Sequence, residues 1–169
     1  MFIGIPGPDM QKHFAYQETH QYCWAACVQM VLSFYGEDRA QSDIDVRGNG
    51  FNLFGWFPDR SGNRFSIENN FNELFVSRFH CTSGEGPVDL TKLLDELENK
   101  RPAIAGYLHN PESHHAVVIF GAEYKLSGAE AIVHTIHVAD PFPGRGFIPL
   151  DSSRFLNSMS AHWFIQKYY

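Results

Sequence analysis

The spacing of apolar residues changes at Arg101-Pro102, and this change constrains the fold more than any other feature of the chain. Before it, apolar side chains recur at three- and four-residue steps, as they do on one face of a helix. After it, short apolar runs alternate with turns that contain Gly or Pro, a pattern typical of β-strands. Helices followed by antiparallel strands predict an α+β fold.

The segment before Arg101 predicts three helices. They are CWAACVQMVLSFYG at 23–36, SIENNFNELFVSRFH at 66–80 and DLTKLLDELENK at 89–100. The first is strongly apolar on one stripe and stops at Gly36, so we expect a central, buried helix. In the second, Ser66 is the candidate N-cap and helical spacing runs as far as Phe79. Between these two helices, residues 37–65 are expected to form loops around a short helical turn near 42–46.

The segment after Arg101 predicts an antiparallel sheet. The expected strands are PAIAGYL, HHAVVIFGAEY, AIVHTIHVAD and HWFIQKYY, with a further closing strand and short helix in RGFIPLDSSRFLNSMSAHWF. We therefore expect one domain with two lobes, a helical lobe over 14–100 and a β lobe over 101–169. A cleft between two such lobes is a usual place for a site.

Composition and charge exclude several classes of function. The chain has 169 residues, 44% of them hydrophobic, which suits one folded domain. Its net charge of −6 argues against nucleic acid as a partner, since phosphate binding needs clustered Lys and Arg. Neither a membrane-spanning run nor a signal peptide is expected, and three cysteines do not form a disulfide framework. We expect a protein that is cytoplasmic as made.

Cys23 is the residue from which chemistry can be argued. A thiol at the start of a helix faces the positive end of the helix dipole, which favours the thiolate. Acyl transfer also needs an imidazole, a group that orients the imidazole, and an amide donor for the oxyanion. His115 begins one apolar strand and Asp140 ends the next, so a hairpin brings them together. Gln17 and Gln21 are the amide candidates just before the cysteine.

Several residues compete with this assignment. A buried, inert cysteine is the alternative for Cys23. Cys27 is expected to pack one turn into the helix, and Cys81 is expected to lie in a loop without a partner. His114 competes with His115, and only one of the two can face the thiol because strand neighbours point to opposite faces. Asp151 is the weaker rival of the carboxylate. His134 and His137 are three apart on a strand, a poor spacing for one metal ion, and no metal or cofactor is expected.

Three motifs, QETHQYCWAAC, HHAVVIFGAEY and VADPFPG, resemble the papain clan of cysteine peptidases. The likeness is strongest to a bacterial branch that includes leader-peptide peptidases and injected effector proteases, and it covers 14–36 and 88–169. It implies a papain-like fold with a central helix that starts at the nucleophile. By position, it makes Cys23 the nucleophile, His115 the general base and acid, Asp140 the orienting group and Gln17 the oxyanion donor.

The resemblance also has departures. Plant and animal papains often have Asn in place of Asp140, although Asp can do the same orienting work. His115 follows Cys23 at a shorter separation than in the papain enzymes themselves, which implies a trimmed groove. Trp24 either lines the cleft or packs between the lobes. Trp24 and His114 are the predicted substrate-binding residues. Leader peptidases usually sit on a transporter, a role that we do not expect for a chain without a membrane segment.

The resemblance implies a cysteine endopeptidase that acts on a protein or peptide, with a toxin or effector as the expected biological role. Such a protein would be delivered into a target cell by a secretion system and held in check by an immunity or inhibitor protein. The same acyl-enzyme chemistry can serve a glutamine deamidase or a transglutaminase-like toxin. A catalytically idle papain-fold binding module is the non-enzymatic alternative.

Overall fold

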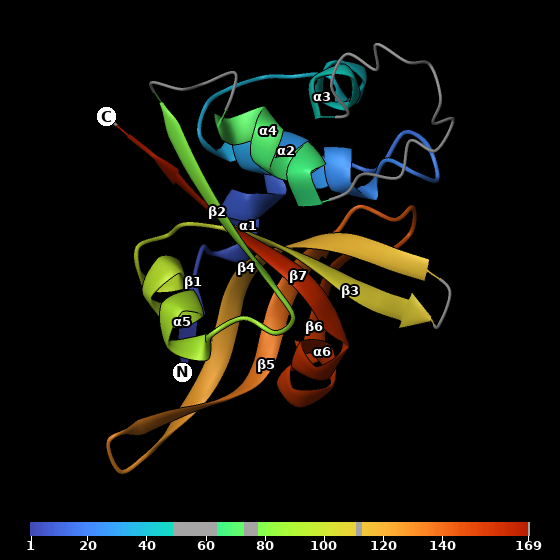
Figure 1. Ribbon diagram of the computed structural model, residues 1–169. Helices are drawn as coiled ribbons and strands as arrows, with labels where there is room; N and C mark the ends of the chain where they lie inside the picture. The colour runs from blue at the N-terminus through green and yellow to red at the C-terminus, as the bar shows by residue number, and fades with distance from the viewer. Residues whose placement is uncertain (49–63, 73–77, 111–112, 169) are drawn as a thin grey trace.

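The protein is built on one antiparallel sheet that runs through the middle of the molecule (Figure 1). The computed structural model describes residues 1–48, 64–72, 78–110 and 113–168. In spatial order the sheet is β2-β7-β3-β4-β5-β6, and β1 pairs with β4 off this path. The strands are β1 Phe2–Gly4, β2 Phe79–Glu85, β3 Ala103–Asn110, β4 Ser113–Ser127, β5 Glu130–Asp140, β6 Gly146–Asp151 and β7 Met159–Lys167.

Helices cover both faces of this sheet (Figure 1). They are α1 Gly7–Gln11, α2 Cys23–Phe34, α3 Gln41–Gly48, α4 Arg64–Asn72, α5 Leu90–Glu98 and α6 Ser152–Ser158. The first four pack on one face around α2, and α5 and α6 pack on the other. Within the described part of the chain, no helix has the length and apolar character that crossing a membrane requires.

Alternation along the strands divides the apolar residues between two cores. In β4, Val118 packs into the core that contains α2, whereas its neighbours Val117 and Ile119 pack into the core beneath α5 and α6. This is the period-two pattern of a strand buried on both faces. The sheet is therefore held between two apolar layers, which fixes the positions of its strand ends.

The structure confirms most of the predicted elements. The apolar helix at 23–36 is α2, and Gly36 ends it with a φ of 85°, a conformation that favours glycine. The helix at 89–100 is α5, capped by the Asp89 carboxylate, which accepts hydrogen bonds from two backbone N–H groups. The expected strands after Arg101 are β3, β4, β5 and β7, and the closing strand and helix are β6 and α6. The turn near 42–46 is α3, and residues 49–63 lie outside the described residues.

One predicted helix was placed wrongly at both ends. Ser66 lies inside α4 instead of capping it, and Phe79 and His80 belong to strand β2. Cys81, expected in a loop, is also in β2. Buried Phe79 and Cys81 alternate with exposed His80, and the strand pairs along its length with β7. This distant pairing overrides the local helical spacing, so the sheet takes strand β2 from the predicted helical lobe over 14–100, and it takes β1 from the residues before that lobe.

Candidate active site

Cys23 is the first residue of α2, as the sequence predicted. The helix has no side-chain cap at this end, and its N-cap position is Tyr22. The backbone N–H groups of a first helical turn have no acceptor within the helix, so they remain available to a ligand. Cys23 is a free, partly exposed cysteine at this helix start.

Strand register brings His115 and Asp140 together. Val118 pairs with Ala139 across β4 and β5, which sets Asp140 opposite Val117. His115 lies near the start of β4 and Asp140 is the last residue of β5, so the antiparallel pairing brings the two residues to the same end of the sheet. Nε2 of His115 lies 2.6 Å from Oδ1 of Asp140. The predicted hairpin between the two strands is thus confirmed, together with the contact that it was expected to create.

The second ring nitrogen of His115, Nδ1, faces the Cys23 thiol. Because Nε2 faces the carboxylate, Nδ1 is the nitrogen left for the side-chain hydrogen bond between His115 and Cys23. Burial alone would lower the pKa of His115, but the hydrogen bonds with Asp140 and Cys23, and the negative charge of both partners, raise it to about 9. His115 is therefore protonated at neutral pH and lies between two groups that it can stabilise as anions.

Asp140 is fully buried, and both of its carboxylate oxygens take part in hydrogen bonds. Its Oδ1 also accepts a hydrogen bond from the Phe142 backbone N–H at 2.9 Å, and its Oδ2 accepts one from Nη1 of Arg145 at 3.3 Å. Burial alone would raise the pKa of Asp140, but the hydrogen bonds from His115, Phe142 and Arg145 outweigh it and hold the pKa below its ordinary value. The carboxylate is therefore ionised and fixed in place.

Gln17 lies in the cleft with the thiol but does not have free amide protons. Its Nε2 donates to the backbone carbonyls of Thr19 at 2.9 Å and of His20 at 3.2 Å. Its Oε1 is buried and has no hydrogen-bond partner among the described residues. The Gln17 backbone N–H donates to the Pro141 carbonyl, which ties it to the residue after Asp140. The rival amide, Gln21, is exposed on the segment before α2.

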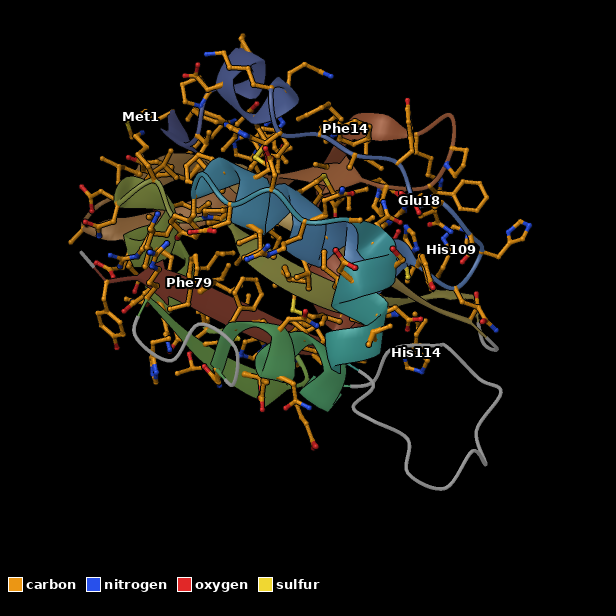
Figure 2. The ribbon with its side chains drawn as sticks, turned by 90° about the horizontal axis from the view of Figure 1, so that it is seen from above. Met1, Phe14, Glu18, Phe79, His109 and His114 are labelled. Atoms are coloured by element: carbon orange, nitrogen blue, oxygen red, sulfur yellow. The ribbon has the colours of Figure 1, made fainter. Side chains whose placement is uncertain are left out.

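A cleft of about 190 Å³ joins these groups. It is lined from the segment before α2, from the ends of β3 and β4 and from the turn after β5, by Gln17, His20, Cys23, His109, Ser113, His114, His115, Phe142 and Arg145. His114 thus reaches the cleft, where its Nδ1 lies 3.3 Å from the Ser160 hydroxyl. Figure 2 shows His109 and His114 at one end of the molecule, far from Met1.

Trp24 does not line the cleft. Its side chain is only 3% exposed and belongs to the apolar core around α2. Its placement as a substrate-binding residue is therefore not supported, and of the two interpretations of Trp24 the structure favours packing.

The residues that competed for catalytic or metal-binding roles in the sequence make structural contacts instead. Asp151 is the N-cap of α6, where its carboxylate accepts the Arg154 backbone N–H. His137 pairs with Glu123, with 2.8 Å between Nε2 and Oε1. Cys27 is buried, and burial raises the pKa of its thiol well above the ordinary value, with the nearby Cys23 and Asp140 charges adding to the shift.

Cys81 is also buried, and burial with the Glu68 charge raises its pKa to about 12. Both of these thiols are consequently poor nucleophiles. Across the described ranges, no group of three or more His, Cys, Asp or Glu residues could hold a metal ion.

Sequence reasoning assigned Arg145, His109 and Phe142 no role in the active site. The stretch that contains Arg145 and Phe142 was interpreted only as a turn, PFPGRG. The turn folds back so that Arg145 reaches both Asp140 and His109, whose Nε2 lies 3.3 Å from Nη2 of the arginine. An arginine five residues after a buried carboxylate is the only signal in the sequence, and it is a weak one.

Three solved structures that share this fold are peptidases. The peptidase domain of Streptococcus ComA, a bifunctional ABC transporter, is 14% identical over 91% of this chain and 97% of its own, with a TM-score of 0.66. A double-glycine-motif protease from an AMS/PCAT transporter, solved with its leader peptide, is 17% identical over 90% and 89%, with a TM-score of 0.59. A digestive procathepsin L2 from Tenebrio molitor is 11% identical over 95% and 67%, with a TM-score of 0.52. No curated protein sequence matches the chain.

The fold is therefore that of the papain-like cysteine peptidases, as the sequence motifs predicted. The model of the Peptidase_C39 like family matches residues 11–158. The chain belongs to this family and is a cysteine peptidase, a hydrolase.

Proposed function

We propose that this peptidase is an endopeptidase that hydrolyses peptide bonds through Cys23, His115 and Asp140. The observation that carries the proposal is the arrangement of His115, whose two nitrogens serve a buried carboxylate and the thiol at the start of α2. A free thiol and an imidazole with a raised pKa line one cleft, and the carboxylate beneath it holds the imidazole; these are the parts that acyl transfer needs.

The first half of the reaction forms an acyl-enzyme. The Cys23 thiolate attacks the carbonyl carbon of the scissile bond, and the carbonyl oxygen becomes an oxyanion. The Cys23 backbone N–H donates to this oxyanion. His115 then gives its proton to the departing amine nitrogen, the C–N bond breaks, and a thioester remains on Cys23.

The second half restores the enzyme. His115, now neutral, takes a proton from a water molecule, whose oxygen attacks the thioester carbon. The C–S bond breaks, the product leaves as a carboxylic acid, and the thiolate again faces a protonated His115. Throughout, Asp140 holds the imidazole in the orientation that keeps Nδ1 toward the sulfur.

Gln17 is proposed as the side-chain donor to the oxyanion. Its amide is now bound to two backbone carbonyls, so it must release one of them when the oxyanion forms. Rotation of the amide costs less because its buried Oε1 has no hydrogen-bond partner among the described residues, so no hydrogen bond to that oxygen is lost.

A peptide or protein is the proposed substrate class. One structural neighbour, the AMS/PCAT transporter protease, was solved with its leader peptide, which supports a peptide in the corresponding cleft here. Resemblance to injected effector proteases supports a toxin or effector role, with delivery into a target cell and an immunity protein as partner. We test that role by cytoplasmic expression of the wild type beside Cys23→Ala: equal growth of the two cultures would end the toxin proposal.

The activity is tested by mass spectrometry of a cell lysate incubated with the wild type, Cys23→Ala or Cys27→Ala. We expect new protein N-termini with the wild type and with Cys27→Ala, and none with Cys23→Ala. Deamidated glutamines without cleavage would move the enzyme to the deamidase alternative. Cuts confined to double-glycine sequences would place it with the leader-peptide peptidases, and no change in any sample would favour a binding module.

A further inference from the structure

One wall of the cleft beside Cys23 carries basic side chains that the proposed reaction does not use. Arg145, His109 and His114 lie on the β-sheet side of the cleft, and His20 faces them from the segment before α2. No described residue that lines the cleft is acidic, and the carboxylate beneath it, Asp140, is fully buried and paired. The positive charge of Arg145 in this cleft stands in a chain with a net charge of −6, so it is a local feature and not part of a generally basic surface.

Arg145 is held rigidly and still has hydrogen-bond donors to spare. Its guanidinium contacts the Asp140 carboxylate, Nε2 of His109 and the Tyr107 side chain. A guanidinium carries five N–H groups, so these three contacts leave about two for a ligand. The side chain is 36% exposed at the cleft, which makes those donors accessible.

His109 supports the arginine as a hydrogen-bond partner. Arginine only donates hydrogen bonds, so Nε2 of His109 accepts one and the ring proton lies on Nδ1. The Phe142 ring lies against the same guanidinium, 5.9 Å from its central carbon to the ring centroid. An arginine fixed in this way binds an anion with little further loss of side-chain freedom.

The position of Arg145 indicates which part of a peptide it meets. It contacts Asp140, which lies beyond His115 as seen from Cys23, and the rings of His109 and His115 are 6.2 Å apart. His115 gives its proton to the departing amine, so groups around His115 face the leaving half of the substrate. Arg145 and His109 thus lie beside the residues that follow the scissile bond.

We propose that Arg145, supported by His109, binds a carboxylate in the leaving half of the substrate, within the first residues after the scissile bond. The carboxylate is an Asp or Glu side chain or the free C-terminus of a short departing segment, and either can accept hydrogen bonds from the donors that Arg145 has left. This inference rests on the proposed peptidase activity and names the substrate class of the same cleft.

The test uses a proteome-derived peptide library and the purified full chain. Cleavage sites read by mass spectrometry are expected to be enriched in Asp and Glu just after the cut. The best site is then made as matched peptides with Glu or Gln at that position, and with a free or an amidated C-terminus. We expect a roughly ten- to hundredfold higher kcat/KM for the peptide with the carboxylate. The pair that shows the preference identifies which carboxylate is bound.

Variants separate recognition from chemistry. Arg145→Gln should lower the Glu-over-Gln ratio to about one, whereas Arg145→Lys should keep a reduced preference because the charge remains. Arg154→Gln is the matched control, since Arg154 is an exposed arginine of α6 outside the cleft. If Arg145→Gln slows both peptides equally and the ratio stays, Arg145 only positions Asp140 and the proposal is overturned. If no library peptide is cut in a Cys23-dependent way, the proposed peptidase activity itself fails.

Discussion

His115 presents Nε2 to Asp140 at 2.6 Å and so leaves Nδ1 for Cys23. The fully buried Asp140 carboxylate therefore determines which ring nitrogen of His115 faces the Cys23 sulfur. The consequence is that the protonation of His115 depends on the two groups that the reaction needs on either side of it.

The first prediction concerns the titration of His115. Its ring should titrate with a midpoint near pH 9 in the wild type, and Asp140→Ala should move that midpoint downward because the hydrogen bond and the charge of the carboxylate are lost. NMR of ring-labelled histidine measures both values. A midpoint near the ordinary value of 6.5 in the wild type would contradict the structure.

The same shift predicts how stability changes with pH. The pKa of His115 is higher in the folded chain than in the unfolded one, so its contribution is complete below pH 6.5 and is lost as the pH rises through about 9. The free energy of unfolding should therefore fall over that interval, and less so in His115→Gln. Urea unfolding at a series of pH values measures the difference between the two proteins.

The three thiols should differ in reactivity. Iodoacetamide is expected to modify Cys23 and to spare Cys27 and Cys81 in the native protein, because both of these are buried and both have a raised pKa. Mass spectrometry of the digested protein locates the label. Labelling of all three in denaturant is the control, and equal native labelling of Cys27 would show that the helix start does not distinguish the thiols.

Gln17 should affect turnover more than substrate binding. Gln17→Ala is expected to lower kcat about 10²- to 10³-fold with a small change in KM, the usual loss for one oxyanion donor. Gln21→Ala, at an exposed position, is the matched control and should stay near wild type. Thermal melting of both variants shows whether losing the Thr19 and His20 contacts has loosened the segment.

Gly4 should be required for the packing of β1 on β4. Its φ is 129°, and an added Cβ would lie 2.6 Å from Cα of Gly121. Gly4→Ala is therefore expected to cost about 1–3 kcal/mol or more, which is several degrees in Tm. Gly7→Ala is the control, because nothing lies within 4 Å of the Cβ that it adds. Equal Tm values for the two variants would contradict this close approach.

The sequence predicted the features that local patterns and a simple hairpin determine. Helix α2 follows from its apolar stripe, and the meeting of His115 and Asp140 follows from two adjacent strands with a short connection. Strand β2 could not be predicted in this way, because its partner β7 lies far along the chain and the local spacing is helical.

Arg145 escaped sequence reasoning for a related reason. Its reach to Asp140 depends on the turn between β5 and β6, where Gly144 and Gly146 take φ values of 87° and 67°. Residue types alone do not specify such a path. The burial of Trp24 similarly depends on how α2 is turned against the sheet, which the position next to Cys23 does not reveal.

The catalytic residues come from the sheet and from the helix layer beside it, and the contacts within the sheet differ in kind from those between the two layers. His115 and Asp140 belong to neighbouring strands joined by backbone hydrogen bonds, whereas Cys23 belongs to a helix that packs on the sheet through apolar side chains. A shift of the helix layer against the sheet therefore parts sulfur from imidazole while the imidazole keeps its carboxylate. Low concentrations of denaturant should accordingly abolish activity before the protein unfolds. Activity should return as soon as the helix packs against the sheet again.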